Sequence, residues 1–149
     1  MEDISGQLEA LCEGTNNNIS LLSNASALLN ESLSDINWIG FYLIDKNRLI
    51  LGPFQGKVAC TQIDIGKGVC GASYEKKMLL NVSNVHEFPG HIACDSASNS
   101  ELVIPLIYNG QRYGVLDIDS PSFNRFTYED EINLQKAADI IAKYISRNI

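Results

Sequence analysis

The hydrophobic spacing of this chain changes once, and that change limits the folds that it can adopt. Apolar residues recur at helical spacing over residues 4–33, with a break near 14–18 where Thr15 or Asn17 suits a helix cap. From Trp38 onward they come in short aromatic and β-branched runs, which are typical of strands. The pattern therefore predicts two N-terminal helices followed by a sheet.

The rest of the chain predicts short strands joined mainly by tight turns. Asn109-Gly110 is a strong signal for a two-residue hairpin, and Thr127 with Asp130 forms a capping box before the last helix. This order predicts one α+β domain over residues 1–149, with a mostly antiparallel central sheet and the terminal helices packed on one face. The expected elements are a hairpin of 38–44 with 48–51, a strand at 58–63, a glycine loop at 65–71, a helix at 72–77, a strand at 78–82, a hairpin of 101–108 with 112–119, and a helix at 128–147.

Charge and hydropathy exclude several classes of partner. The chain has 149 residues, a formal net charge of −7 and scattered lysines and arginines, so we expect no nucleic-acid partner. The acidic N-terminus does not resemble a secretory signal, and the apolar run 39–44 is too short to cross a bilayer. We therefore expect a cytoplasmic protein without a membrane partner. Thiols stay reduced in that compartment, which favours a catalytic or metal-binding role for clustered cysteines.

Three of the four cysteines have polar or glycine-rich neighbours. Cys60 follows GPFQGKVA, Cys70 lies in IGKGVCG, and Cys94 lies between a Pro-Gly-His turn and a run of small polar residues that includes Asp95, Ser96 and Ser98. We expect loops that expose these thiols, and hence cysteine redox catalysis. Cys12 lies on the apolar face of a helix, where packing is the simpler explanation.

A zinc site is the alternative for the same cysteines. The three thiols together with His86 or His91 would supply enough ligands. Structural zinc sites usually contain a closely spaced cysteine pair, however, and no CxxC occurs in this chain. We therefore expect neither a metal nor a cofactor.

Carboxylates and aromatic residues form the second candidate cluster. Asp117 and Asp119 lie two apart in a strand and so share one face; beside Glu101 they would repel one another and raise at least one pKa. Such a group can bind an ammonium ion and donate a proton. Trp38 and Tyr42 also share a strand face. The alternatives are a solvated strand at the sheet edge for the carboxylates, and core packing for the aromatic pair.

Several segments together identify a family. NWIGFYLI, LGPFQGKVAC, IGKGVCG, HEFPGHIACDSASNSELVIPL and GVLDIDSPSFNRF resemble the free methionine-(R)-sulfoxide reductases, which are single-domain members of the GAF superfamily. The resemblance covers about residues 37–126 and includes cysteines that generic GAF domains lack. It implies a GAF-like fold, a homodimer, and reduction of free L-methionine (R)-sulfoxide to L-methionine.

The resemblance also implies roles for individual residues. It assigns the nucleophile to Cys94, a resolving thiol to Cys70, and a further cysteine able to form a disulfide with the nucleophile to Cys60. A sulfenic acid on Cys94 would give an intramolecular disulfide, which thioredoxin would reduce; the order of the two other thiols stays open. Glu101 or Asp119 would donate the proton to the sulfoxide. The implied substrate pocket consists of Trp38, Tyr42, Glu101, Asp117 and Asp119. A GAF domain that senses a small molecule without catalysis is the alternative function.

Overall fold

A central antiparallel sheet organises the molecule. The computed structural model describes residues 2–91, 94 and 97–149. Its six strands have the order β3-β2-β1-β6-β5-β4, and all neighbours are antiparallel, which confirms the predicted α+β class. The elements are α1 (Ser5–Glu13), α2 (Asn18–Ser32), β1 (Trp38–Asp45), β2 (Arg48–Gly56), β3 (Gln62–Asp64), α3 (Gly68–Lys76), β4 (Leu80–Val82), the 3₁₀ helix η1 (Val85–Glu87), β5 (Ser100–Tyr108), β6 (Gln111–Ser120) and α4 (Tyr128–Arg147).

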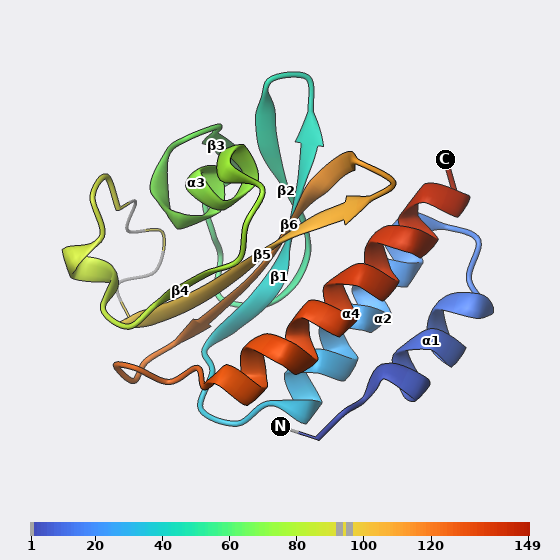
Figure 1. Ribbon diagram of the computed structural model, residues 1–149, viewed down its shortest axis with the longest axis horizontal. Helices are drawn as coiled ribbons and strands as arrows, with labels where there is room; N and C mark the ends of the chain where they lie inside the picture. The colour runs from blue at the N-terminus through green and yellow to red at the C-terminus, as the bar shows by residue number, and fades with distance from the viewer. Residues whose placement is uncertain (1, 92–93, 95–96) are drawn as a thin grey trace.

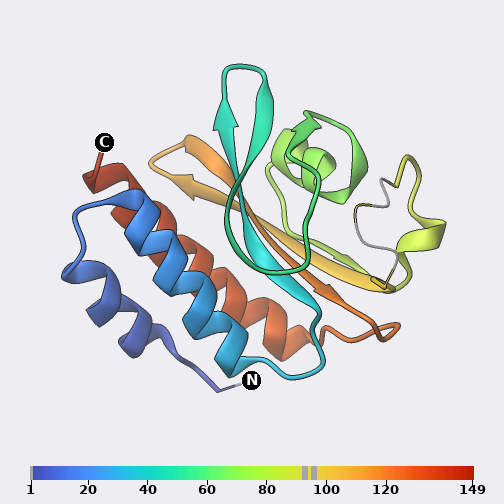
Figure 2. The same cartoon turned by 180° about the vertical axis from the view of Figure 1, so that it is seen from behind.

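The helices divide between the two faces of the sheet. The views from the front and from behind show α2 and α4 against one face with α1 outside them, while α3 lies across the other face (Figures 1 and 2). Alternate residues of β1, β5 and β6 point into the helical layer and build the main core. The opposite set of side chains on these strands is left for the second face, where the site lies.

The terminal helices confirm the local predictions. Asn17, and not Thr15, caps α2, since its side chain accepts hydrogen bonds from the backbone N–H groups of Ile19 and Ser20. Cys12, on the inner face of α1, is fully buried in the helical core, as expected. Among the described helices, none combines the length and apolar character needed to cross a membrane.

The capping box of α4 forms as predicted. The Thr127 hydroxyl accepts a hydrogen bond from the Asp130 backbone at 3.1 Å, and the Asp130 carboxylate accepts one from the Thr127 backbone at 2.9 Å. Arg125 also binds this carboxylate, at 2.9 Å. A buried charge therefore fixes the start of the longest helix.

The prediction for residues 58–82 is wrong in three places. The strand expected at 58–63 is reduced to β3, α3 begins at Gly68 rather than residue 72, and β4 begins at Leu80. The predicted exposed loop around Cys70 is instead a buried helical turn. The glycines explain this, because they allow close packing: a Cβ on Gly71 would lie 2.5 Å from the Asp64 carbonyl oxygen.

Candidate functional site

The face of the sheet opposite the terminal helices carries the candidate site. Trp38 pairs with Asp119 across β1 and β6, and Glu101 pairs with Asp119 across β5 and β6, so Asp119 lies between the other two. Tyr42 and Asp117 point to the same side. The structure thus brings all five predicted pocket residues together, and the cavity among them measures about 40 Å³. Its remaining lining is Ala59, Ile63, Lys67, Gly68, Val69, Cys70, His91, Cys94 and Ser98.

Burial dominates the electrostatics of the carboxylates. Glu101 is 8% exposed and Asp117 is 5% exposed, and β6 lies between β1 and β5, so the solvated sheet edge considered above is wrong. Burial raises the pKa of Glu101 well above its usual value, and the charges of Asp117 and Asp119 raise it further. Burial also raises the pKa of Asp117. The cluster therefore loses its protons at a higher pH than isolated carboxylates would.

Aromatic rings form one wall of the pocket. Trp38 stacks on Tyr42 with ring centroids 5.9 Å apart, and on Phe54 of β2 at 5.2 Å. Tyr42 donates a hydrogen bond to the Cys60 carbonyl oxygen at 2.9 Å, which ties the segment that carries Cys60 to β1. Sequence reasoning did not anticipate the contact of Phe54, which arises because β2 pairs with β1.

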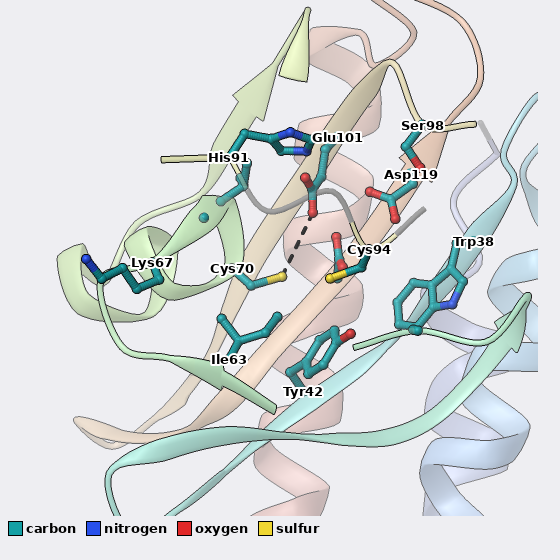
Figure 3. A pocket seen from close by; sticks show the side chains of 14 residues that line it. Trp38, Tyr42, Ile63, Lys67, Cys70, His91, Cys94, Ser98, Glu101 and Asp119 are labelled. Carbon is teal, nitrogen blue, oxygen red and sulfur yellow. Dashed lines mark hydrogen bonds between the residues drawn. The ribbon is translucent and has the colours of Figure 1, made fainter. Parts of the chain in front are cut away.

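The three candidate cysteines fall into two states. Cys60 and Cys94 form a disulfide with Cα atoms 5.4 Å apart, whereas Cys70 is a free thiol. The Cys70 thiol donates to Glu101 Oε2 at 3.9 Å, and Figure 3 shows both side chains pointing toward Cys94. Burial and then the charge of Asp117 raise the pKa of Cys70 well above that of a free thiol. A zinc site that uses all three thiols does not fit this pairing.

Described residues between β4 and β5 also line the pocket. His91 and Ser98 line the cavity, and the Asn37 side chain donates to the Ser98 hydroxyl at 3.1 Å. Burial lowers the pKa of His91, and the nearby His86 ring lowers it further. Asp95 and Ser96, expected as polar neighbours of Cys94, lie outside the described residues.

Sequence reasoning missed the contribution of α3. Its N-terminal end brings Lys67, Gly68 and Val69 to the cavity beside Cys70 (Figure 3). The glycine-rich segment was predicted as a loop, so its residues were not assigned to a wall of the site. The only signal in the sequence was the run of glycines in this segment. Their structural role depends on contacts with β3, such as that of Gly71 with Asp64, which the local sequence does not show.

Comparison with known proteins identifies the family. Residues 8–145 match the GAF domain model. The free methionine-R-sulfoxide reductase of Escherichia coli K12 is 49% identical over 144 residues, covering 97% of this chain and 87% of that protein. The chain belongs to the free methionine-R-sulfoxide reductase family of GAF domains. The reductase of that name from Saccharomyces cerevisiae is 46% identical over 96% of this chain and 84% of its own length.

Solved structures from this reductase family have the same fold. The free methionine-R-sulfoxide reductase of Neisseria meningitidis, solved in complex with its substrate, superposes with a TM-score of 0.93 at 38% identity, covering 97% of this chain and 87% of that one. The reduced form of the Staphylococcus aureus fRMsr gives a TM-score of 0.91 at 48% identity, covering 95% and 92%. The recognition made from the sequence segments is confirmed at the level of family and fold.

Proposed function

We propose that this chain reduces free L-methionine (R)-sulfoxide to L-methionine. The observation that carries the proposal is the meeting, in one pocket, of a cysteine disulfide with buried carboxylates that have raised pKa values. The disulfide supplies a two-electron redox couple, and the carboxyls supply protons and negative charge. The names of the reductases from Escherichia coli and Saccharomyces cerevisiae support the choice of substrate.

Different pocket residues would bind different parts of the substrate. Glu101, Asp117 and Asp119 would bind the α-ammonium group, because a cluster of carboxylates stabilises a cation out of bulk water. Trp38 and Tyr42 would pack against the methyl and sulfur end. Cys94 is tied to Cys60 in this structure and cannot act as a nucleophile there, so we infer that substrate enters the reduced protein.

The reaction divides into two thiol steps. The Cys94 thiolate attacks the sulfoxide sulfur while Glu101 or Asp119 protonates the sulfoxide oxygen. The hydroxyl then transfers to the Cys94 sulfur as the bond between the two sulfur atoms breaks, so methionine leaves with its sulfur reduced and Cys94 becomes a sulfenic acid. A second thiol then attacks the Cys94 sulfur, water leaves, and a disulfide forms. The raised pKa of Glu101 supports its role as a proton donor at neutral pH.

Cys60 is our choice for the second thiol. Its Cα position already suits a disulfide with Cys94, at 5.4 Å. Cys70 is buried and its pKa is raised by burial and by carboxylates, so it stays protonated and is a weak nucleophile at neutral pH. The sequence resemblance left the order of these two thiols open, and the pairing of Cys60 with Cys94 supports Cys60.

The partners follow from this redox cycle. Thioredoxin would reduce the Cys60–Cys94 disulfide, which fits a reducing compartment such as the cytoplasm. We also propose a homodimer formed through the terminal helices. Ile19 on α2 is 72% exposed and Ile132 on α4 is 42% exposed, and a partner helix would cover such residues. The proposal keeps the whole chain, residues 1–149, as one GAF domain.

The substrate assignment is tested by removing one charge. Free methionine sulfoxide and its N-acetyl derivative are compared as substrates, with dithiothreitol as reductant and kcat/KM as the readout. Loss of the ammonium charge should lower kcat/KM at least about 100-fold, because the buried carboxylates then lack their counter-ion. Equal values would contradict the proposal. Tight binding of the free sulfoxide without turnover would favour the non-catalytic sensor instead.

A further inference from the structure

Three groups from three different elements converge beside the disulfide. Cys70 of α3, Glu101 of β5 and Asp117 of β6 each place one potential ligand atom so that all three atoms lie within 4.8 Å of one another. The Cys70 sulfur lies 3.9 Å from Glu101 Oε2, and all three residues are buried. Figure 3 shows the first two facing the same space. The redox cycle proposed above uses the Glu101 and Asp117 carboxyls, but it does not need the free Cys70 thiol.

One buried oxygen atom of this cluster lacks a hydrogen-bond partner among the described residues. Asp117 is only 5% exposed, and its Oδ1 atom has no hydrogen-bond partner among the described residues. Buried carboxylate oxygens are nearly always satisfied, because leaving one without a partner costs about 1–3 kcal/mol or more. The adjoining cavity of about 40 Å³ provides space for an ion or a water molecule next to it. The site is therefore polar, partly unsatisfied and large enough for a small cation.

We propose that Cys70, Glu101 and Asp117 bind a thiophilic divalent cation, with Zn²⁺ as the best match. Zinc bonds of about 2.3 Å to sulfur and about 2.1 Å to oxygen place tetrahedral ligand atoms about 3.4–3.6 Å apart. The observed sulfur–oxygen separation of 3.9 Å needs only a small closure to reach this geometry. A water molecule from the cavity fills the fourth position, as in zinc sites with three protein ligands.

The ligand set also determines which cation fits. A thiolate with two carboxylates suits zinc, whereas magnesium and calcium prefer oxygen ligands alone. Binding displaces the proton of the Cys70 thiol, because zinc binds the thiolate form of cysteine. Lys67 and His91 also line the pocket, and Asp119 adds a further carboxylate to it.

The site implies a second property if the function proposed above is correct. A cation held by Glu101 and Asp117 occupies the carboxylates that would bind the substrate ammonium group. Zinc should then inhibit the reductase competitively with free methionine sulfoxide. This consequence rests on the proposed function, whereas the metal site does not.

Cobalt(II) spectroscopy tests the site without any substrate. The probe is Co²⁺ added to the Cys60→Ser/Cys94→Ser variant, in which Cys70 and the buried Cys12 are the only thiols left. We expect a sulfur-to-cobalt charge-transfer band in the near ultraviolet that saturates at one equivalent. Adding Cys70→Ser should abolish the band, and adding Cys12→Ser should leave it unchanged. No band, or a band that survives Cys70→Ser, would overturn the proposal.

A second variant separates binding from folding. Asp117→Asn keeps the size of the side chain and the thiol but removes one charged ligand. In the same background it should weaken Zn²⁺ affinity at least about tenfold, measured by competition with a chromophoric chelator. Circular dichroism verifies that each variant is folded. If Cys70→Ser does not fold, the Zn²⁺ affinity of Asp117→Asn decides whether the site exists. Unchanged Zn²⁺ affinity in folded Asp117→Asn would also overturn the site.

Discussion

Cys94 and Cys12 have opposite surroundings, and their substitution should have opposite results. Cys94 lines the pocket in a disulfide, while Cys12 is fully buried in the helical core. Cys94→Ser should lower turnover at least about 10³-fold, because a hydroxyl is a far weaker nucleophile toward sulfur at neutral pH. Cys12→Ser should leave the rate per folded molecule nearly unchanged. Steady-state rates with dithiothreitol measure both, and appreciable activity in Cys94→Ser would contradict the proposed nucleophile.

Cys60 and Cys70 should contribute differently to the recycling of the enzyme by thioredoxin. Cys60→Ser should lose most of the thioredoxin-dependent turnover, because Cys60 is the residue paired with Cys94. Cys70→Ser should lose less, since the protonated Cys70 thiol is a poor resolving group. Either variant should still release about one methionine per site in a single turnover. Mass spectrometry after that turnover should find Cys60 joined to Cys94 in the wild type; a Cys70–Cys94 bond would reverse the assignment.

At the scale of single elements, the start of α4 has a measurable stability. Asp130→Asn should lower the free energy of unfolding by about 1–2 kcal/mol at pH 7, since it weakens the capping box and removes the ion pair with Arg125. Glu129→Gln, an exposed change in the same turn, is the matched control. Urea denaturation of both variants measures the difference, and equal losses would show that the cap carries no special weight.

The same carboxylate predicts a direction with pH. Burial tends to raise the pKa of Asp130, but hydrogen bonds from Thr127 and the charge of Arg125 outweigh it, so the folded-state pKa is lowered. The stabilisation is therefore present above the unfolded value of about 3.9 and is lost as pH falls through the lower folded value. The gap between wild type and Asp130→Asn should shrink below about pH 4.

The close packing of α3 onto β3 is a second test at this scale. Gly71→Ala would bring a Cβ to 2.5 Å from the Asp64 carbonyl oxygen, and should cost about 1–3 kcal/mol of stability. Gly6→Ala in α1 is the control, because nothing lies within 4 Å of its Cβ position; it should stabilise by about 0.5–1 kcal/mol. Thermal melts of both variants decide, and a neutral Gly71→Ala would refute the tight contact.

These elements show where local sequence is sufficient and where it is not. The capping box at Thr127 and the hairpin at Asn109-Gly110 involve residues close in sequence, so their side chains alone predicted them. The start of α3 depends on Gly71 packing against Asp64, and the length of β3 depends on its pairing with β2. Those contacts join segments that no local pattern relates.

The site shows the same limit for the whole molecule. Strand alternation predicted that Asp117 and Asp119 share a face, and the fold confirms it. Register then places Asp119 between Trp38 and Glu101, which alternation cannot reveal because it relates different strands. The sequence could not identify the partner of Cys94 either, because the pairing depends on where the fold places Cys94 relative to Cys60, which precedes β3. Family resemblance narrowed the choice to two thiols and no further.

Stereospecific reduction of free methionine sulfoxide tests the proposed function most directly. An equal mixture of the R and S sulfur epimers of free L-methionine sulfoxide is incubated with the wild-type protein and excess dithiothreitol. The two epimers that remain are then separated by chromatography and measured. The family membership predicts complete loss of the R epimer, an equal amount of methionine, and an untouched S epimer. Survival of both epimers, or loss of both at similar rates, would contradict the function proposed for this chain.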